Sequence, residues 1–346
     1  MSLRPVYPGF DEMRGRVGVV VPAWFSDDTP VTAAAELLLT TLIDSPCCLR
    51  PGDVCVVVDG SETARAAVAA IREEVASAWG FRLIDLPENR GKGGAVVAGV
   101  RALLEASPEL CWIATRDADA DHAIEDLPHL FRVGEQLAEE CPGQAVCVIG
   151  RRADLHAPLG WVRGEYELLL NEVLVEAVAF ALAREGRAWD TRYLAERAPD
   201  LQSGYKLYSR EAAASAVAAL QKAGAADAHL LRAGMEVVPF VTLALSGAVF
   251  AEVERKTFHD QPVTSYGSVD FTRFYGSKLA WALRTCRVPL AAAALLFDGA
   301  AGRRPLYTDP DGRAGILALR RFVLEHLAGG PLPAGIPPEP RTRRFL

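Results

Sequence analysis

The first 150 residues alternate between short apolar runs and segments with helical spacing, and this alternation constrains the fold more than any other feature. Strands that alternate with helices favour an open, mostly parallel sheet flanked by helices, which is an α/β fold. The sequence predicts strands over 17–21, 53–58, 81–86, 110–115 and 144–149, and helices over 30–42, 62–79, 91–106 and 126–140.

The second half of the chain is less regular. The expected elements are a long helix over 161–184, a charged loop over 185–200, strands over 201–208 and 236–245, a helix over 211–223, a polar loop over 252–270, and mostly helical structure over 271–322. The tail from residue 329 is rich in proline and arginine and is expected to be poorly ordered.

Polar residues follow the predicted strands at the points where those strands end. Ligands of open α/β sheets bind beyond the carboxyl ends of the strands. The candidates at these ends are Pro22, Ala23, Asp59, Glu88, Asn89, Arg90, Asp117 and Asp119.

Three carboxylates follow the fourth predicted strand, at Asp117, Asp119 and Asp121. Carboxylates this close repel one another unless a cation or another partner lies among them. Oxygen ligands suit Mg²⁺ or Mn²⁺, which typically bridge protein carboxylates and substrate phosphates. The alternative is a solvated acidic turn that caps the helix beginning near Asp126.

A glycine-rich turn precedes the predicted helix over 91–106, with Lys92, Gly93 and Gly94 in its first turn. Backbone N–H groups at a helix N-terminus attract anions. The turn is not a Walker A loop, because Gly93 follows Lys92 where Ser or Thr is required. It is not a dinucleotide fingerprint either, because Val96 takes the place of the last glycine. The alternative is a plain tight turn.

A histidine would be able to supply a nitrogen ligand to the same metal. His259 is the preferred candidate, in a polar loop, and His122 and His229 compete with it. Whether any of the three completes the metal site stays open.

Composition excludes several classes of protein. The net charge is −7 and no run of five basic residues is present, so nucleic acid is not an expected partner. The seven cysteines form no CxxC pair and are expected to be reduced thiols. No signal peptide is expected, and the apolar stretches 237–250 and 288–297 are too short to span a bilayer. The expected location is cytoplasmic, with peripheral membrane contact and a homodimer left open.

Five segments together resemble family 2 glycosyltransferases. They are VGVVVPA at 17–23, VVVDGS at 56–61, NRGKGGAVVAG at 89–99, DAD at 117–119 and QSGYKLYSRE at 202–211. The segments occur in the order seen in that family, and the chain is most similar to the subgroup that makes polyprenyl- or dolichyl-phosphate sugars. The similarity covers about residues 15–265.

The resemblance implies a GT-A fold that binds a nucleotide sugar, UDP- or GDP-linked, with Mg²⁺ or Mn²⁺. It divides the chain into an N-terminal arm (1–15), a GT-A domain (16–265, with a nucleotide-sugar half over 16–150 and an acceptor half over 151–265), a helical extension (266–328) and a flexible tail (329–346).

The resemblance also implies roles for single residues. Those assigned to the nucleotide are Pro22, Ala23, Asp59, Asn89, Lys92, Gly93 and Asp117. Those assigned to the sugar and acceptor are Gln202, Ser203, Gly204 and Tyr205. Asp119 and His259 would hold the metal. Asp227 and Asp117 would be catalytic, with Asp227 as the base of an inverting transfer.

Three departures from the subgroup bear on the acceptor. The second segment has one Asp, at 59, where two are usual; the insert around 183–199 is longer; and membrane helices are missing. A lipid phosphate and a small soluble acceptor both stay open. A phosphatase of the HAD type and a non-catalytic nucleotide-sugar-binding protein are the alternatives to a transferase.

Overall fold

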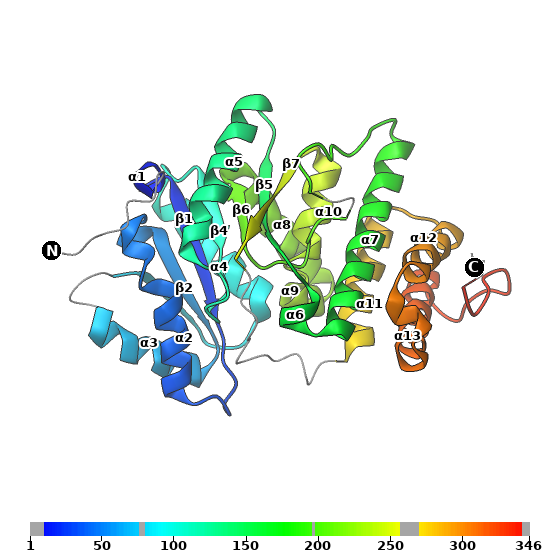
Figure 1. The fold of residues 1–346 in the computed structure, drawn as a ribbon, viewed down its shortest axis with the longest axis horizontal. Coiled ribbons are helices and arrows are strands. Elements are labelled where there is room, and N and C mark those ends of the chain that lie inside the picture. The colour runs from blue at the N-terminus through cyan, green and yellow to red at the C-terminus, as the bar shows by residue number, and fades with distance from the viewer. Residues whose placement is uncertain (1–9, 76–79, 196–197, 257–269, 341–346) are drawn as a thin grey trace.

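Seven strands form one mixed sheet in the computed structural model of the chain (Figure 1), which describes residues 10–75, 80–195, 198–256 and 270–340. The strands are β1 (Val17–Ala23), β2 (Val54–Asp59), β3 (Arg82–Leu86), β4 (Trp112–Thr115), β5 (Val146–Arg152), β6 (Lys206–Ser209) and β7 (Val249–Arg255). Their order across the sheet is β3-β2-β1-β4-β6-β5-β7. The predicted α/β fold with a mostly parallel sheet is confirmed.

One strand runs against the others. β6 pairs antiparallel with both β4 and β5, whereas β1–β2, β1–β4, β2–β3 and β5–β7 are parallel pairs. Thr115, the last residue of β4, is opposite Lys206, the first residue of β6. The segment that enters β6 therefore lies beside the segment that leaves β4, although 90 positions separate them in the sequence.

Helices cover both faces of the sheet. One face is covered by α2 (Val31–Leu42), α3 (Glu62–Val75) and α5 (Leu127–Glu140), and the other by α4 (Gly91–Ala106), α7 (Trp161–Arg184) and α8 (Arg210–Ala226). In β1, Val19 and Val21 belong to the first core and Val20 to the second. Side chains of a strand alternate between faces, so a strand that is buried on both sides is continuously apolar.

Further helices extend the face that α7 and α8 cover: α6 (His156–Leu159), α9 (Ala228–Ala233), α10 (Val237–Ser246), α11 (Phe271–Thr285), α12 (Leu290–Gly302) and α13 (Pro310–Ala328). α1 (Phe10–Met13) lies elsewhere, against α5. α11 packs on α7, α9 and α10. α12 and α13 lie beyond it, on the side of the molecule opposite α2 and α3 (Figure 1).

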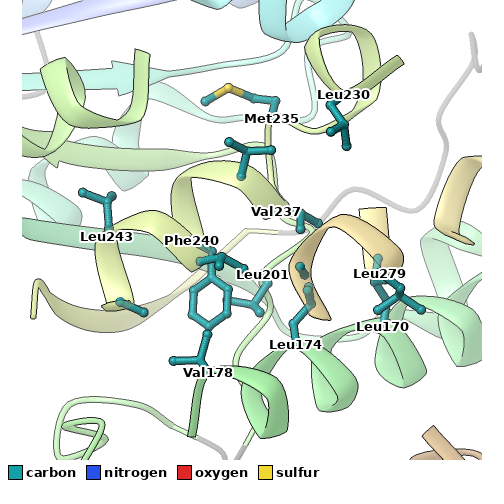
Figure 2. Packing of buried hydrophobic residues seen from close by; sticks show 14 of the residues in the cluster. Leu170, Leu174, Val178, Leu201, Leu230, Met235, Val237, Phe240, Leu243 and Leu279 are labelled. Carbon is teal, nitrogen blue, oxygen red and sulfur yellow. The ribbon is translucent and has the colours of Figure 1, made fainter. Parts of the chain in front are cut away.

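The predicted strand over 236–245 is wrong, because these residues form α10. α10 packs against α7, α8 and α11, and Figure 2 shows its Phe240 side chain beside Val178 of α7. A helix buried on nearly every side is apolar at nearly every position, and periodicity cannot separate it from a buried strand. The strand follows instead: Gly247, at φ +88°, ends α10 and β7 begins at Val249, so part of the predicted loop over 252–270 is strand.

Most other boundaries agree with expectation. The helices over 91–106 and 161–184 coincide with α4 and α7, whereas β6 is shorter than the predicted strand over 201–208. Residues 329–340 form no helix or strand, but Arg320 donates to the carbonyl of Pro337 at 2.9 Å, which fixes this part of the predicted flexible tail to α13. Among the described helices, none combines the length and the apolarity needed to cross a bilayer.

Candidate active site

The polar residues predicted at the strand ends lie at one edge of the sheet. Pro22 and Ala23 close β1 opposite Val57 and Val58, and Asp59 closes β2. Asp117 lies two residues beyond the end of β4. Because these strands are parallel neighbours, their carboxyl ends meet at the same edge.

A chain of charges crosses this edge from Asp117 through Lys92 to Glu236. The Lys92 ammonium lies 2.8 and 3.0 Å from the two carboxylate oxygens of Asp117 and 3.2 Å from Oε1 of Glu236. The three residues come from the loop after β4, the first turn of α4 and the residue before α10. Their side chains are 28, 29 and 13% exposed, so the group is open to ligand but largely withdrawn from water.

Lys92 and Glu236 favour each other's ionised forms. Burial works against the charge of Lys92, but Asp117 and Glu236 outweigh burial and raise its pKa. Burial likewise favours the protonated form of Glu236, but Lys92, Lys278 and Lys206 outweigh it and hold the pKa of this carboxyl below its usual value. Glu236 is therefore an ionised carboxylate at neutral pH.

The acidic cluster divides into three roles. Asp117 pairs with Lys92, and Asp121 pairs with the buried Arg255, whose Nη2 lies 2.8 Å from Oδ2 of Asp121. Within the described residues Asp119 has no such cation, and its Oδ1 accepts only the backbone N–H of Asp121, at 3.2 Å. Burial and the nearby Asp117 raise the pKa of Asp119 to about 6. Asp119 is thus the carboxylate of the cluster that lacks a counter-charge.

A divalent cation fits this donor set. A cation beside Asp119 would relieve the crowding of its carboxylate with Asp117, and oxygen ligands suit Mg²⁺ or Mn²⁺. Within the described residues, no three carboxylate, imidazole or thiol groups converge to hold a metal. Protein ligands would therefore be few, and phosphate oxygens of a substrate would complete the shell, as is usual for Mg²⁺.

The loop that carries these aspartates is held from beneath by an imidazole and a phenol. The buried His122 accepts the N–H of Asp117 at Nδ1, at 2.9 Å, and its ring stacks on Tyr205 at 4.9 Å. Tyr205 donates its hydroxyl proton to the carbonyl of Ala123 at 3.1 Å. These contacts make His122 and Tyr205 supports of the loop, and the Nδ1 of His122 is already occupied.

The glycine-rich turn is shaped by packing against α9. A Cβ on Gly93 would lie 2.1 Å from the carbonyl oxygen of Leu231, and one on Gly91 would lie 2.4 Å from Cα of Arg232. The buried Asp59 accepts the N–H of Arg90 at 2.7 Å and so fixes the turn to β2. Packing and hydrogen bonding thus explain why glycines and Asp59 occupy these positions. Their contact with a nucleotide stays a prediction.

Asn89 is fixed in the same turn. Its Oδ1 accepts the N–H of Gly91 at 2.9 Å and a proton from Arg232 at 3.0 Å. The side-chain oxygen of Asn89 therefore already accepts two hydrogen bonds from the protein. The NH2 group of the same side chain takes part in neither of them.

The segment Gln202–Tyr205 touches the site at one point. A Cβ on Gly204 would lie 2.4 Å from Oδ2 of Asp117 and 2.7 Å from Nζ of Lys92, so only glycine lets the chain pass this pair. Ser203 donates to the carbonyl of Gly150 at 2.6 Å, and Gln202 donates to Asn171 at 3.1 Å. Gly204 therefore borders the site, while its neighbours fix the segment to β5 and α7.

The structure does not bring Asp227 to Lys92 or Asp117. Its exposed carboxylate accepts the N–H of His229 at 2.9 Å and caps α9, and within the described residues its side chain makes no other hydrogen bond. His229 packs edge-on against Phe274. His259 lies outside the described residues.

Two charged residues of this region escaped the sequence analysis. Glu236 was hidden by the strand expected over 236–245, which would place it at the amino end of a strand, where no site is expected. Lys278 lies in α11, within a segment expected only to be helical. Lys278 could have been found from the sequence as a charged residue that interrupts the apolar face of a predicted helix.

Comparison with known protein families adds one finding. A family model described as Glycosyl transferase family 2 matches residues 37–213, just over half of the chain. The match contains Asp59, Lys92, Asp117 and Asp119 and ends before Glu236. A search of the curated proteins finds no match.

Proposed function

The chain belongs to glycosyl transferase family 2, and from this premise we propose that it moves a hexose from a UDP- or GDP-linked donor to an acceptor hydroxyl, with Mg²⁺ or Mn²⁺ and with inversion. The observation that carries the proposal is the charge chain Asp117–Lys92–Glu236 beside the uncompensated Asp119. It supplies an anchor for a cation and an ionised base at one edge of the sheet.

The donor side of the site is the carboxyl edge of β1, β2 and β4. Pro22, Ala23 and Asp59 are proposed to border the base and ribose, as the family resemblance implies, and Asp119 to hold the cation. When bound, the cation would offset the negative charge that develops on the departing nucleoside diphosphate. Lys92, fixed by Asp117, would present its ammonium to the same region without having to reorganise.

Glu236 is the favoured base. In an inverting transfer the acceptor oxygen bonds to the anomeric carbon, the bond from that carbon to the nucleoside diphosphate breaks, and the hydroxyl proton passes to a carboxylate. Glu236 is ionised, inward-facing and in contact with Lys92, whereas Asp227 is exposed and caps a helix. The choice between these two carboxylates is tested below.

The family membership argues against a HAD-type phosphatase, whose aspartates would attack a phosphate ester. The resemblance to polyprenyl- and dolichyl-phosphate sugar synthases remains a proposal, as does any membrane-peripheral location. A non-catalytic binding protein would show nucleotide binding without turnover.

A thermal-shift panel of UDP, GDP, ADP and TDP, each with and without Mn²⁺, tests the donor and metal together, because stabilisation follows ligand occupancy. Stabilisation by UDP or GDP that requires Mn²⁺ is expected, and slow release of the nucleoside diphosphate from the matching sugar donor should accompany it. Binding of none of the four would overturn the proposal, and so would release of phosphate from simple phosphate esters.

A further inference from the structure

Lys278 of α11 is a buried cation without a polar partner. The residue is 2% exposed, and its Nζ lies 3.7 Å above the centre of the Phe274 ring. Within the described residues it takes part in no hydrogen bond or ion pair. The other buried cations of the described chain all have polar partners: Arg116 and Lys206 donate to backbone carbonyls, and Arg152, Arg255 and Arg320 each face a carboxylate.

The surroundings of Lys278 leave its charge unbalanced. Burial lowers its pKa to about 8, and Lys92 and Arg163 act in the same direction, while Glu236 and Glu167 oppose them. Neither carboxylate is within ion-pair distance of Nζ. A ring face attracts an ammonium, but it accepts no classical hydrogen bond from it.

The position of this ammonium is fixed relative to Glu236. Leu279 and Val237, the residues next to Lys278 and Glu236, are buried in the same hydrophobic cluster (Figure 2). This cluster joins α10 and α11, which also pack directly against each other. Lys278 is therefore no mobile surface lysine. It lies on a helix that packs against the helix that begins directly after Glu236, and the two charges act on each other electrostatically.

We propose that Lys278 binds an anionic group of the acceptor, and that the acceptor is a molecule carrying a hydroxyl for Glu236 and a separate carboxylate or phosphate for Lys278. The inference rests on the function proposed above. A buried ammonium is unfavourable unless it is paired, and a ligand anion would supply the missing partner. The same anion would be repelled by Glu236 unless it lies on the side of Lys278, which orients the hydroxyl toward the carboxylate.

This assignment separates the two halves of the substrate site. The family match ends at residue 213, so Lys278 belongs to a part of the chain that the family model does not describe. Acceptor choice would thus be made by the helical extension. A lipid phosphate that attacks through its own phosphate oxygen needs no such hydroxyl and is a competing outcome of the test.

The experiment uses the full chain, saturated with Mn²⁺ and with whichever nucleoside diphosphate binds to it. Thermal shifts are then measured with three matched three-carbon probes. They are glycerol, glycerate and glycerol phosphate, and vesicles containing a polyprenyl phosphate form a fourth arm. Wild-type protein is expected to bind glycerate or glycerol phosphate at least about 10-fold more tightly than glycerol. Lys278→Met should weaken that binding about 10- to 100-fold, the size of one charge-assisted hydrogen bond. Lys222→Met, which removes an exposed lysine of α8, should leave it unchanged.

Three results would overturn the inference: equal binding of glycerol and the anions, equal anion binding by wild type and Lys278→Met, or binding of the lipid vesicles alone. If Lys278→Met fails to fold, the wild-type preference among the probes still decides the charge of the acceptor. Failure of every nucleoside diphosphate to bind would instead overturn the proposed function, so the two failures are distinguishable.

Discussion

The proposed nucleotide side and the proposed acceptor side of the site differ in the sign of the charge that lacks a partner. On the nucleotide side Asp117 faces Lys92 and Asp121 faces Arg255, and Asp119 alone lacks a cation. On the acceptor side the uncompensated charge is a cation, Lys278.

On the proposed function, Asp119 would face a cation and Lys278 would face an anionic group of the acceptor. Pairing every charge would stabilise the free protein and would leave nothing for a substrate to neutralise. An unpaired carboxylate suits a metal and an unpaired ammonium suits an anion. Single substitutions can alter the two sides separately.

Replacing Asp119 tests the nucleotide side. Asp119→Ala should reduce sugar transfer by at least about 1,000-fold, because a bound cation contributes several kcal/mol to stabilising the departing diphosphate. The Mn²⁺-dependent part of the thermal shift with UDP or GDP should vanish as well. Asp311→Ala, an exposed aspartate of α13, is the control and should behave as wild type. Unchanged metal-dependent activity in Asp119→Ala would contradict the assignment.

Replacing Glu236 tests the base. Glu236→Gln keeps the volume of the side chain and removes its charge, so kcat should fall about 100- to 10,000-fold, the usual contribution of a general base. Donor binding should change little, because Lys92 retains Asp117. Glu105→Gln, on the exposed side of α4, is the matched control. A kcat within about threefold of wild type would exclude Glu236 as the base, since general bases contribute far more.

The placement of the residues proposed to bind the nucleotide could be predicted from the sequence, because these residues follow strands. Short apolar runs fix the strands, parallel pairing brings their carboxyl ends together, and Asp59 and Asp117 are therefore neighbours of one edge. The support given by His122 and Tyr205 could not be predicted in this way. It depends on β6 running antiparallel beside β4, which no local pattern shows.

The acceptor side was beyond prediction for a different reason. Glu236 and Lys278 act through helices that contact each other across 42 positions of sequence, and neither belongs to a strand end. α10 is apolar on nearly every side, so its pattern did not distinguish it from a strand. Asp227 was assigned as the base only through the family resemblance, and in the structure its carboxylate caps α9.

Arg152 shows what pairing a buried cation contributes. Its guanidinium contacts Asp200 at 2.6 Å and Glu167 at 2.7 Å, and all three residues are buried. Arg152→Met should lower the free energy of unfolding by about 3–5 kcal/mol, because two buried carboxylates lose their partner. Arg65→Met is the control: Arg65 also faces two carboxylates, Asp85 and Glu62, but at the surface, and no measurable loss is expected.

The buried Lys278 also predicts a pH dependence of the free energy of unfolding. The pKa of Lys278 is lowered from 10.5 to about 8 in the folded protein, chiefly by burial, with Lys92 and Arg163 assisting and Glu236 and Glu167 opposing. Between these two values the unfolded chain binds the extra proton at this residue, so the contribution of Lys278 to stability should rise with pH. Relative to Lys278→Met, wild type should gain up to about 3 kcal/mol between pH 7.5 and roughly 10.5, at about 1.4 kcal/mol for each unit of pKa.

The measurement is the difference in the free energy of unfolding between the two proteins, from denaturant titrations at each pH. His229, which also packs near Phe274, has a pKa lowered by burial and does not titrate in this range. Every other titrating group is common to both proteins, so the difference isolates Lys278. A constant difference across the range would mean that the Lys278 ammonium is already paired in the folded protein.

The smallest effect is expected at Asp227, and it decides between the two carboxylates proposed as the base. Asp227→Ala removes the N-cap of α9 and should lower the free energy of unfolding by about 1 kcal/mol. Asp227→Asn keeps a capping oxygen and should cost almost nothing, because Asn and Asp cap helices about equally well. Both variants should retain kcat within about twofold if Glu236 accepts the proton, since a cap contributes stability and no general-base catalysis. A loss of about 100-fold in Asp227→Asn with unchanged stability would instead assign the proton transfer to Asp227, since only its charge would have changed.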